Sequence, residues 1–385
     1  MRGLAALIVC FDHFRHVFFV EYHELPSRHA LFLIPYLITA AGRQAVIIFF
    51  VLSGFLVGGS VLRAFQQNTW TWKQYLIHRF VRLWLVLIPA LLLGIFWDSF
   101  GLYLHSHLSG NSGQLLQTFA RGTPAPSLQQ RLNLHFKSDA KDFFGNLFFV
   151  QTILVPPLGS NGPLWSLANE FWYYLLFPLG LFALTTRYKL ATRAIFAFLF
   201  VLIAFFVGKS IFMLFPLWLM GVALFFVPPR QFSHASRIVA SAAYITFLLV
   251  CVQLARNYPF IDYLLGLVTA AYIWLLISAT DRSSGGAGEA FARGTARFSY
   301  TLYLVHMPLL IFLGSFLVHD SQWHPNLHSL LIVFGLACIT LLYARGLASL
   351  TEFRVDPVKK WAETRLTSYH LTNETISLSN NEETS

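Results

Sequence analysis

The feature that most constrains this chain is the recurrence of long apolar stretches, each close to twenty residues in length. A helix of about twenty residues crosses about 30 Å of hydrocarbon, because each residue adds about 1.5 Å along the axis. Ten such stretches occur, near residues 4–21, 43–62, 83–104, 168–186, 194–209, 210–228, 237–255, 260–279, 298–317 and 329–349. The sequence therefore predicts an all-α fold, a polytopic membrane helix bundle of about ten transmembrane helices.

Composition supports this class and excludes two others. Of the 385 residues, 56% are hydrophobic and 11% are charged, whereas about a quarter of the residues in a soluble domain are charged. The net charge of +10 comes from short basic clusters between apolar stretches, as the positive-inside rule predicts. We therefore expect the lipid bilayer, and no nucleic acid, as a partner. The three cysteines have no metal-ligand spacing, so no metal site is predicted.

Basic residues in the short connections predict the orientation. Those on one side are Arg63, Lys73, Arg79, Arg82, Arg187, Lys189, Arg193, Arg230, Arg237, Arg282, Arg293, Arg297, Arg354, Lys359, Lys360 and Arg365. We therefore expect a multi-pass protein of the cell (plasma) membrane, with both termini in the cytoplasm. The long connection 105–165 is expected to lie outside, partly folded over the membrane mouth, and residues 31–41 to form an interfacial or re-entrant piece. We expect a membrane domain at 1–350 and a cytoplasmic tail at 351–385 with a disordered distal part.

The first apolar stretch carries ionisable residues in its middle. Arg2 and His13 are eleven residues apart, so on a helix they share a face and are separated by about 16 Å. Ionisable groups within a spanning helix are costly and indicate function. A neutral His13 suits the role of a base that accepts a hydroxyl proton, with Asp12 as its neighbouring carboxylate. The alternative is a set of hydrogen bonds that only holds the helices together.

Two further groups carry polar side chains into apolar stretches. Arg79 and Arg82 lie at helical spacing, where two guanidinium groups can hold phosphates, although snorkelling arginines at a helix end are the common alternative. The segment 162–170 contains Trp165, Ser166, Asn169 and Glu170. A lone acid just inside a membrane helix needs a partner.

Two weaker signals lie elsewhere in the chain. Tyr303 and His306 precede Pro308 and can line a shared cavity, although a buried histidine satisfied by hydrogen bonds is at least as common. Ser53 and Gly54 fit close helix packing. The catalytic interpretation requires the arginines and the imidazole of His13 to open into the same cavity.

Five segments occur in the order RGLAALIVCFDHF, FFVLSGFLV, HRFVRLWLVLIP, PLWSLANEFWYYLLFP and FSYTLYLVHMPL. In this combination the chain resembles the membrane acyltransferase-3 family over about residues 2–350. The resemblance implies a helix bundle that takes an acyl group, usually acetyl, from acyl-CoA at the cytoplasmic face. The acceptor implied is a hydroxyl of a cell-surface or lipid-linked glycan.

The resemblance implies roles for seven residues, namely Arg2, His13, Arg79, Arg82, Trp165, Ser166 and Glu170, and the residue patterns above add Asp12, Asn169, Tyr303 and His306. Catalytic roles are expected for His13, Glu170 and Asp12, and donor binding for Arg2, Arg79 and Arg82. Substrate binding is expected for Trp165, Ser166, Asn169, Tyr303 and His306. No permanently bound cofactor is expected, with acyl-CoA as a co-substrate and polysaccharide-assembly proteins as possible partners. The alternative is a proton-coupled transporter using Asp12, His13 and Glu170, although the internal duplication that transporters often show is not visible.

Overall fold

The computed structural model describes residues 1–25, 30–107, 139–254, 258, 260–278, 286–318 and 322–365. Within this part of the chain the regular structure is helical, and two isolated β-bridges are the only strand-like pairings. The α-helices are α1 (Arg2–Phe18), α2 (Ala30–Thr39), α3 (Gly42–Ser53), α4 (Gly59–Gln66), α5 (Trp72–His107), α8 (Ala140–Leu147), α9 (Trp165–Leu184), α10 (Leu190–Ala223), α11 (His234–Leu254), α12 (Ile261–Ile277), α13 (Ala287–Ala296), α14 (Ser299–Leu317) and α15 (Leu327–Leu350). The predicted all-α membrane bundle is confirmed.

Seven helices among the described residues are long and apolar enough to cross a membrane. Two further helices, α1 and α12, have 17 residues each. The predicted stretches 194–209 and 210–228 are the two segments of α10, which is broken at Gly208 by a φ of 73°. Glycine adopts such a backbone angle without the steric cost that other residues meet. These features account for the difference between seven long helices and the ten that were predicted.

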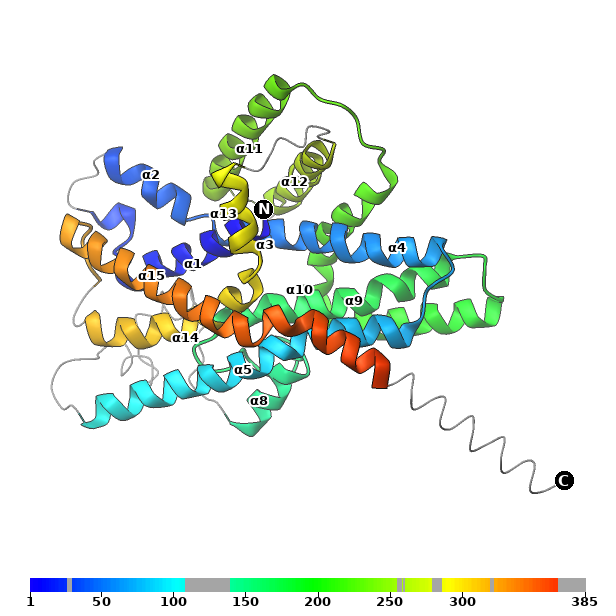
Figure 1. Cartoon of the computed structure of the whole chain (residues 1–385), viewed down its shortest axis with the longest axis horizontal. Coiled ribbons are helices and arrows are strands. Elements are labelled where there is room, and N and C mark those ends of the chain that lie inside the picture. The colour runs from blue at the N-terminus through cyan, green and yellow to red at the C-terminus, as the bar shows by residue number, and fades with distance from the viewer. Residues whose placement is uncertain are drawn as a thin grey trace.

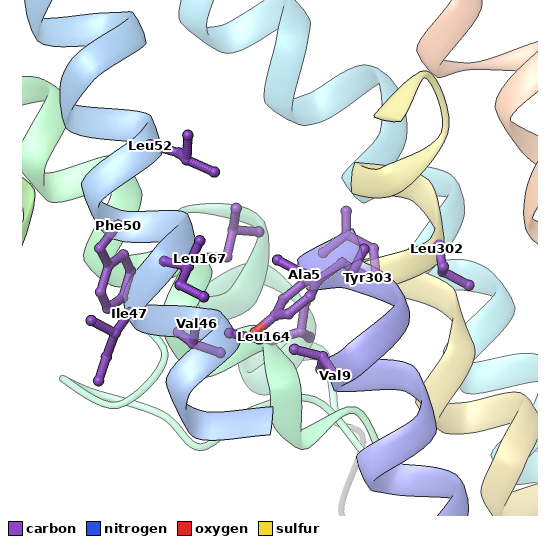
Figure 2. Packing of buried hydrophobic residues seen from close by; sticks show 14 of the residues in the cluster. Ala5, Val9, Val46, Ile47, Phe50, Leu52, Leu164, Leu167, Leu302 and Tyr303 are labelled. Carbon is purple, nitrogen blue, oxygen red and sulfur yellow. The ribbon is translucent and has the colours of Figure 1, made fainter. Parts of the chain in front are cut away.

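Helix α1 lies inside the bundle, packed mainly against α3 and α14 (Figure 1). Figure 2 shows Ala5 and Val9 of α1 between Val46 of α3 and Tyr303 of α14. Because α1 is surrounded by protein, its ionisable residues face other helices and do not have to meet lipid. The first apolar stretch is therefore the central helix of the structure.

A close crossing joins α3 to α10. A Cβ added to Gly54 would lie 1.8 Å from the carbonyl oxygen of Trp218, and one added to Gly221 would lie 1.9 Å from that of Val51. The helix continues from α3 into α4 through a π-helical turn, η2 (Gly54–Gly58). The close packing expected at Gly54 is therefore present, because only a residue without a side chain fits there.

The chain after α15 folds back on the bundle. A 3₁₀ turn, η5 (Glu352–Arg354), leads into a helical segment at 355–365. Glu363 in this segment accepts a hydrogen bond from Gln74 at 3.2 Å and pairs with His78, both near the start of α5. The first part of the expected tail thus packs on α5, while residues 366–385, where disorder is expected, lie outside the described residues.

Candidate active site

A cavity of about 320 Å³ lies among α1, α3, η2, α5, α9 and α14. Its polar lining consists of Arg2, Ser53, Ser60, Arg79, Arg82, Ser166, Glu170, Tyr174, Ser299, Tyr300 and Tyr303. Four helices that are distant in the sequence, α1, α5, α9 and α14, thus bring six of the predicted site residues to one cavity: the three arginines, Ser166, Glu170 and Tyr303.

The three arginines of the cavity, Arg2, Arg79 and Arg82, have no carboxylate within ion-pair distance among the described residues. Within the described residues, none of their guanidinium groups takes part in a hydrogen bond or an ion pair, and Nε of Arg79 is buried. The guanidinium of Arg79 lies 5.6 Å from the ring centres of both Tyr75 and Tyr174, which holds it by cation–π contact. Because buried or half-buried charges are normally paired, this arrangement favours an anionic ligand.

Glu170 supplies the carboxylate of the cavity. Its Oε1 accepts a hydrogen bond from Ser53 Oγ at 2.7 Å and another from the Tyr174 hydroxyl. Ser53 in turn accepts a hydrogen bond from Trp218 Nε1 at 3.2 Å. These contacts fix the orientation of the carboxylate, and Oε2 has no hydrogen-bond partner among the described residues. Oε2 of Glu170 can therefore accept a hydrogen bond from a ligand in the cavity.

The cavity wall nearest to α14 is made by Tyr303 and Ser166. Their hydroxyl oxygens are 2.6 Å apart, and the Tyr303 hydroxyl lies 3.0 Å from the Pro163 carbonyl oxygen. The Ser166 hydroxyl also lies 3.3 Å from the Pro163 carbonyl oxygen, so either hydroxyl can donate to the other while its partner donates to Pro163. This pair locks the start of α9 against α14 and closes the cavity on that side.

Behind this wall lies a histidine pair. His306 is fully buried, and its Nδ1 lies 2.9 Å from the Leu302 carbonyl oxygen, to which only a protonated nitrogen can donate. Its Nε2 is then an acceptor for Nδ1–H of His13, 2.8 Å away. The geometry therefore assigns a tautomer in which Nε2 of His13 carries a free lone pair. His306, expected to bind substrate, contacts His13 and does not line the cavity.

Three other predicted residues also lie outside the cavity lining. Asp12 pairs with Arg15 at 3.4 Å and with His16 at 3.5 Å, and has no hydrogen bond to His13. Neighbouring residues on a helix point about 100° apart, which explains why the side chains of Asp12 and His13 are not hydrogen-bonded to each other. Asn169 donates to the Tyr173 hydroxyl at 3.1 Å and braces α9. Trp165 lines a second cavity, together with Arg43 and Asp262.

The expectation that His13 and the arginines open into the same cavity is not met. His13 is not among the lining residues, and Tyr303, which does line the cavity, has its ring centre 6.2 Å from that of His306. The sequence interpretation also missed Tyr174 and the contact of Ser53 with Glu170. The spacing of four residues between Glu170 and Tyr174 is a signal that would have found the tyrosine.

Comparison with known proteins adds an independent finding. The chain is 29% identical over 164 residues to an uncharacterised protein of Haemophilus influenzae, a match that covers 42% of this chain and 56% of that relative. The chain thus matches little more than half the length of that relative. No solved structure matches the chain. The family model described as an acyltransferase domain matches residues 1–345. The chain therefore belongs to the acyltransferase-3 family.

Proposed function

We propose that this acyltransferase moves an acetyl group from cytoplasmic acetyl-CoA to a hydroxyl of a cell-surface or lipid-linked glycan. The observation that carries the proposal is the set of Arg2, Arg79 and Arg82 around one cavity, with no carboxylate within ion-pair distance among the described residues. Coenzyme A carries a diphosphate and a third phosphate group, and guanidinium forks bind phosphate oxygens two at a time. Three arginines without carboxylate partners suit such a ligand.

The rest of the lining suits the remainder of the donor. Phe49, Leu56 and Val57 offer apolar surface to the pantetheine arm. Oε2 of Glu170 is free to accept a hydrogen bond from one of its amides. In this proposal the phosphates stay near the arginines and the thioester points towards the wall formed by Tyr303 and Ser166.

The transfer step uses the histidine pair. The acceptor oxygen attacks the thioester carbonyl carbon while its proton passes to Nε2 of His13. The carbon–sulfur bond then breaks, and the imidazolium returns the proton to the leaving thiolate. Asp12, one residue away, stabilises the transient positive charge through space. Because Tyr303 lines the cavity and lies beside His306, the proposal includes rotation of its side chain away from Ser166.

The test uses sealed inverted membrane vesicles from cells that express the chain, supplied with radiolabelled acetyl-CoA. Arg82→Ala should raise the KM for acetyl-CoA about tenfold or more, because a charge-assisted hydrogen bond to phosphate is lost. Arg345→Ala, which removes an exposed arginine of α15, is the matched control. Acetyl incorporation into glycan with equal KM values in both variants would contradict the proposed donor site. Proton-coupled uptake without CoA release would indicate a transporter.

A further inference from the structure

A second cavity, of about 310 Å³, lies at the N-terminal end of α3. Arg43 and Asp262 provide its polar groups, and Trp165 and Phe50 its aromatic walls. Its volume falls at the lower end of the range for small-ligand sites, which are largely apolar with a few polar groups. Nothing in the donor proposal uses these residues.

Asp262 has one satisfied and one unsatisfied oxygen. Its Oδ2 accepts hydrogen bonds from Nε of Arg43 at 3.2 Å and from Nη2. Its Oδ1 is buried and has no hydrogen-bond partner within the described residues. The Asp262 side chain is only 5% exposed, whereas that of Arg43 is 64% exposed. A buried carboxylate oxygen without a donor is costly, so this atom is placed for a donor that a ligand brings.

The second cavity shares a wall with the first. Val46 and Phe50 line both cavities, and Trp165, which lines the second, is followed directly by Ser166, which lines the first. At this end of α3, a Cβ on Gly42 would lie 2.4 Å from Oδ2 of Asp12. The second cavity is therefore at the level of the α1 segment that carries His13, and opposite the end where the arginines gather.

We infer that the second cavity binds the acceptor, a neutral sugar ring with free hydroxyl groups. This inference rests on the proposed function and names the acceptor side of the same reaction. A sugar hydroxyl donates to Oδ1 of Asp262, and the apolar face of the ring lies on Trp165, whose aromatic surface is half-buried. Arg43 already neutralises the carboxylate, so a neutral donor fits better than an ammonium group.

The test is equilibrium binding of tritiated maltotriose, a neutral hexose trisaccharide, to the purified full chain in detergent without acetyl-CoA. Asp262→Asn should weaken binding about tenfold, because the charged acceptor is lost while the shape is kept. Trp165→Leu should weaken it through loss of stacking. Glu289→Gln, which alters an exposed carboxylate paired with Arg293 at 3.1 Å, should bind like wild type.

The outcomes separate this inference from the donor proposal. No binding to the wild type at millimolar trisaccharide, or equal binding to wild type and Asp262→Asn, overturns the acceptor site. Binding that depends on Asp262 supports it, and a KM for acetyl-CoA that stays unchanged in Asp262→Asn assigns the residue to the acceptor alone. If binding depends on Asp262 but the wild type transfers no acetyl group, the acceptor site stands and the proposed donor fails.

Discussion

The contact between His13 and His306 shows how one residue sets the chemistry of another. Because Nδ1 of His306 is committed to the Leu302 carbonyl, Nδ1 of His13 must be the donor to His306 and Nε2 of His13 the free base. A general base needs this lone pair before it can take a hydroxyl proton. His306 is thus a positioning residue for His13 in the proposed mechanism.

His13→Ala should lower the acyl-transfer rate about a hundredfold or more, since general base catalysis contributes about that much. His306→Ala should lower it about tenfold, and His306→Gln should recover most of the loss because its amide oxygen can accept the hydrogen bond. The KM for acetyl-CoA should stay unchanged in all three, because neither histidine lines the donor cavity. Equal rates in folded His13→Ala and wild type would reject the assignment.

Individual site residues were predictable where a charge stood in an apolar stretch. Glu170 was found in this way, because such charges are rare in membrane helices. Arg2 was found from its register with His13, and Arg79 and Arg82 from their helical spacing just before an apolar stretch. The partner of His306 was not predictable, since it lies 293 positions away and depends on how α1 packs on α14. Asp262 stands just inside the predicted stretch 260–279, as Glu170 does in 168–186, so the same signal was present and the sequence interpretation missed it.

At the scale of elements, the crossing of α3 and α10 builds the carboxylate end of the donor cavity. The missing side chain at Gly54 lets α10 approach, and that approach brings Trp218 within hydrogen-bond distance of Ser53. The π-helical turn that begins at Gly54 follows at once. Such turns occur often at functional sites.

Gly54→Ala should lower the free energy of unfolding by about 1–3 kcal/mol, and with it the melting temperature, because the new methyl group would overlap the Trp218 carbonyl. Gly346→Ala on α15 is the matched control, since nothing lies within 4 Å of its added Cβ. Thermal unfolding followed by size-exclusion chromatography in detergent measures both. Equal melting temperatures for Gly54→Ala and Gly346→Ala would show that α3 and α10 can move apart without loss of stability.

The long apolar helices were predictable from hydropathy. Hydropathy detects a helix of about twenty apolar residues but does not show which other helices pack against it. It located the helices and, near 209–210, the break that the structure has at Gly208. It did not show that α5 begins at Trp72, because the basic and polar first turns of that helix precede the apolar stretch. The central position of α1 follows from packing, which no local pattern records.

For the whole molecule, contacts between distant connections bear on the predicted orientation. Nη1 of Arg187 donates to the Phe65 carbonyl at 2.6 Å and to Asn68 at 3.1 Å, so the connections α4–α5 and α9–α10 lie together. The segment 355–365 lies on the start of α5. These basic connections thus share one end of the bundle, as the positive-inside rule requires.

A membrane-impermeant maleimide applied to intact cells should therefore label Tyr258→Cys and leave Gln67→Cys unmodified. Both side chains are exposed, and they lie in connections predicted on opposite sides. Cys10 and Cys251 are buried, whereas Cys338 on the apolar helix α15 is exposed, so the unaltered chain is the control that measures labelling of Cys338. Labelling of Gln67→Cys from outside would reverse the orientation and place the arginines away from cytoplasmic CoA.

The wall that Val46 and Phe50 form between the two cavities bears on the cell's energy supply. In the proposed arrangement the donor enters the first cavity from one side of the membrane and the acceptor enters the second cavity from the other, so a water-filled passage between them would leak protons and other ions. Branched and aromatic hydrocarbon side chains offer hydrated ions no hydrogen bonds, so they interrupt any continuous file of water. We therefore expect the proposed transfer to proceed without dissipating the ion gradient across the membrane.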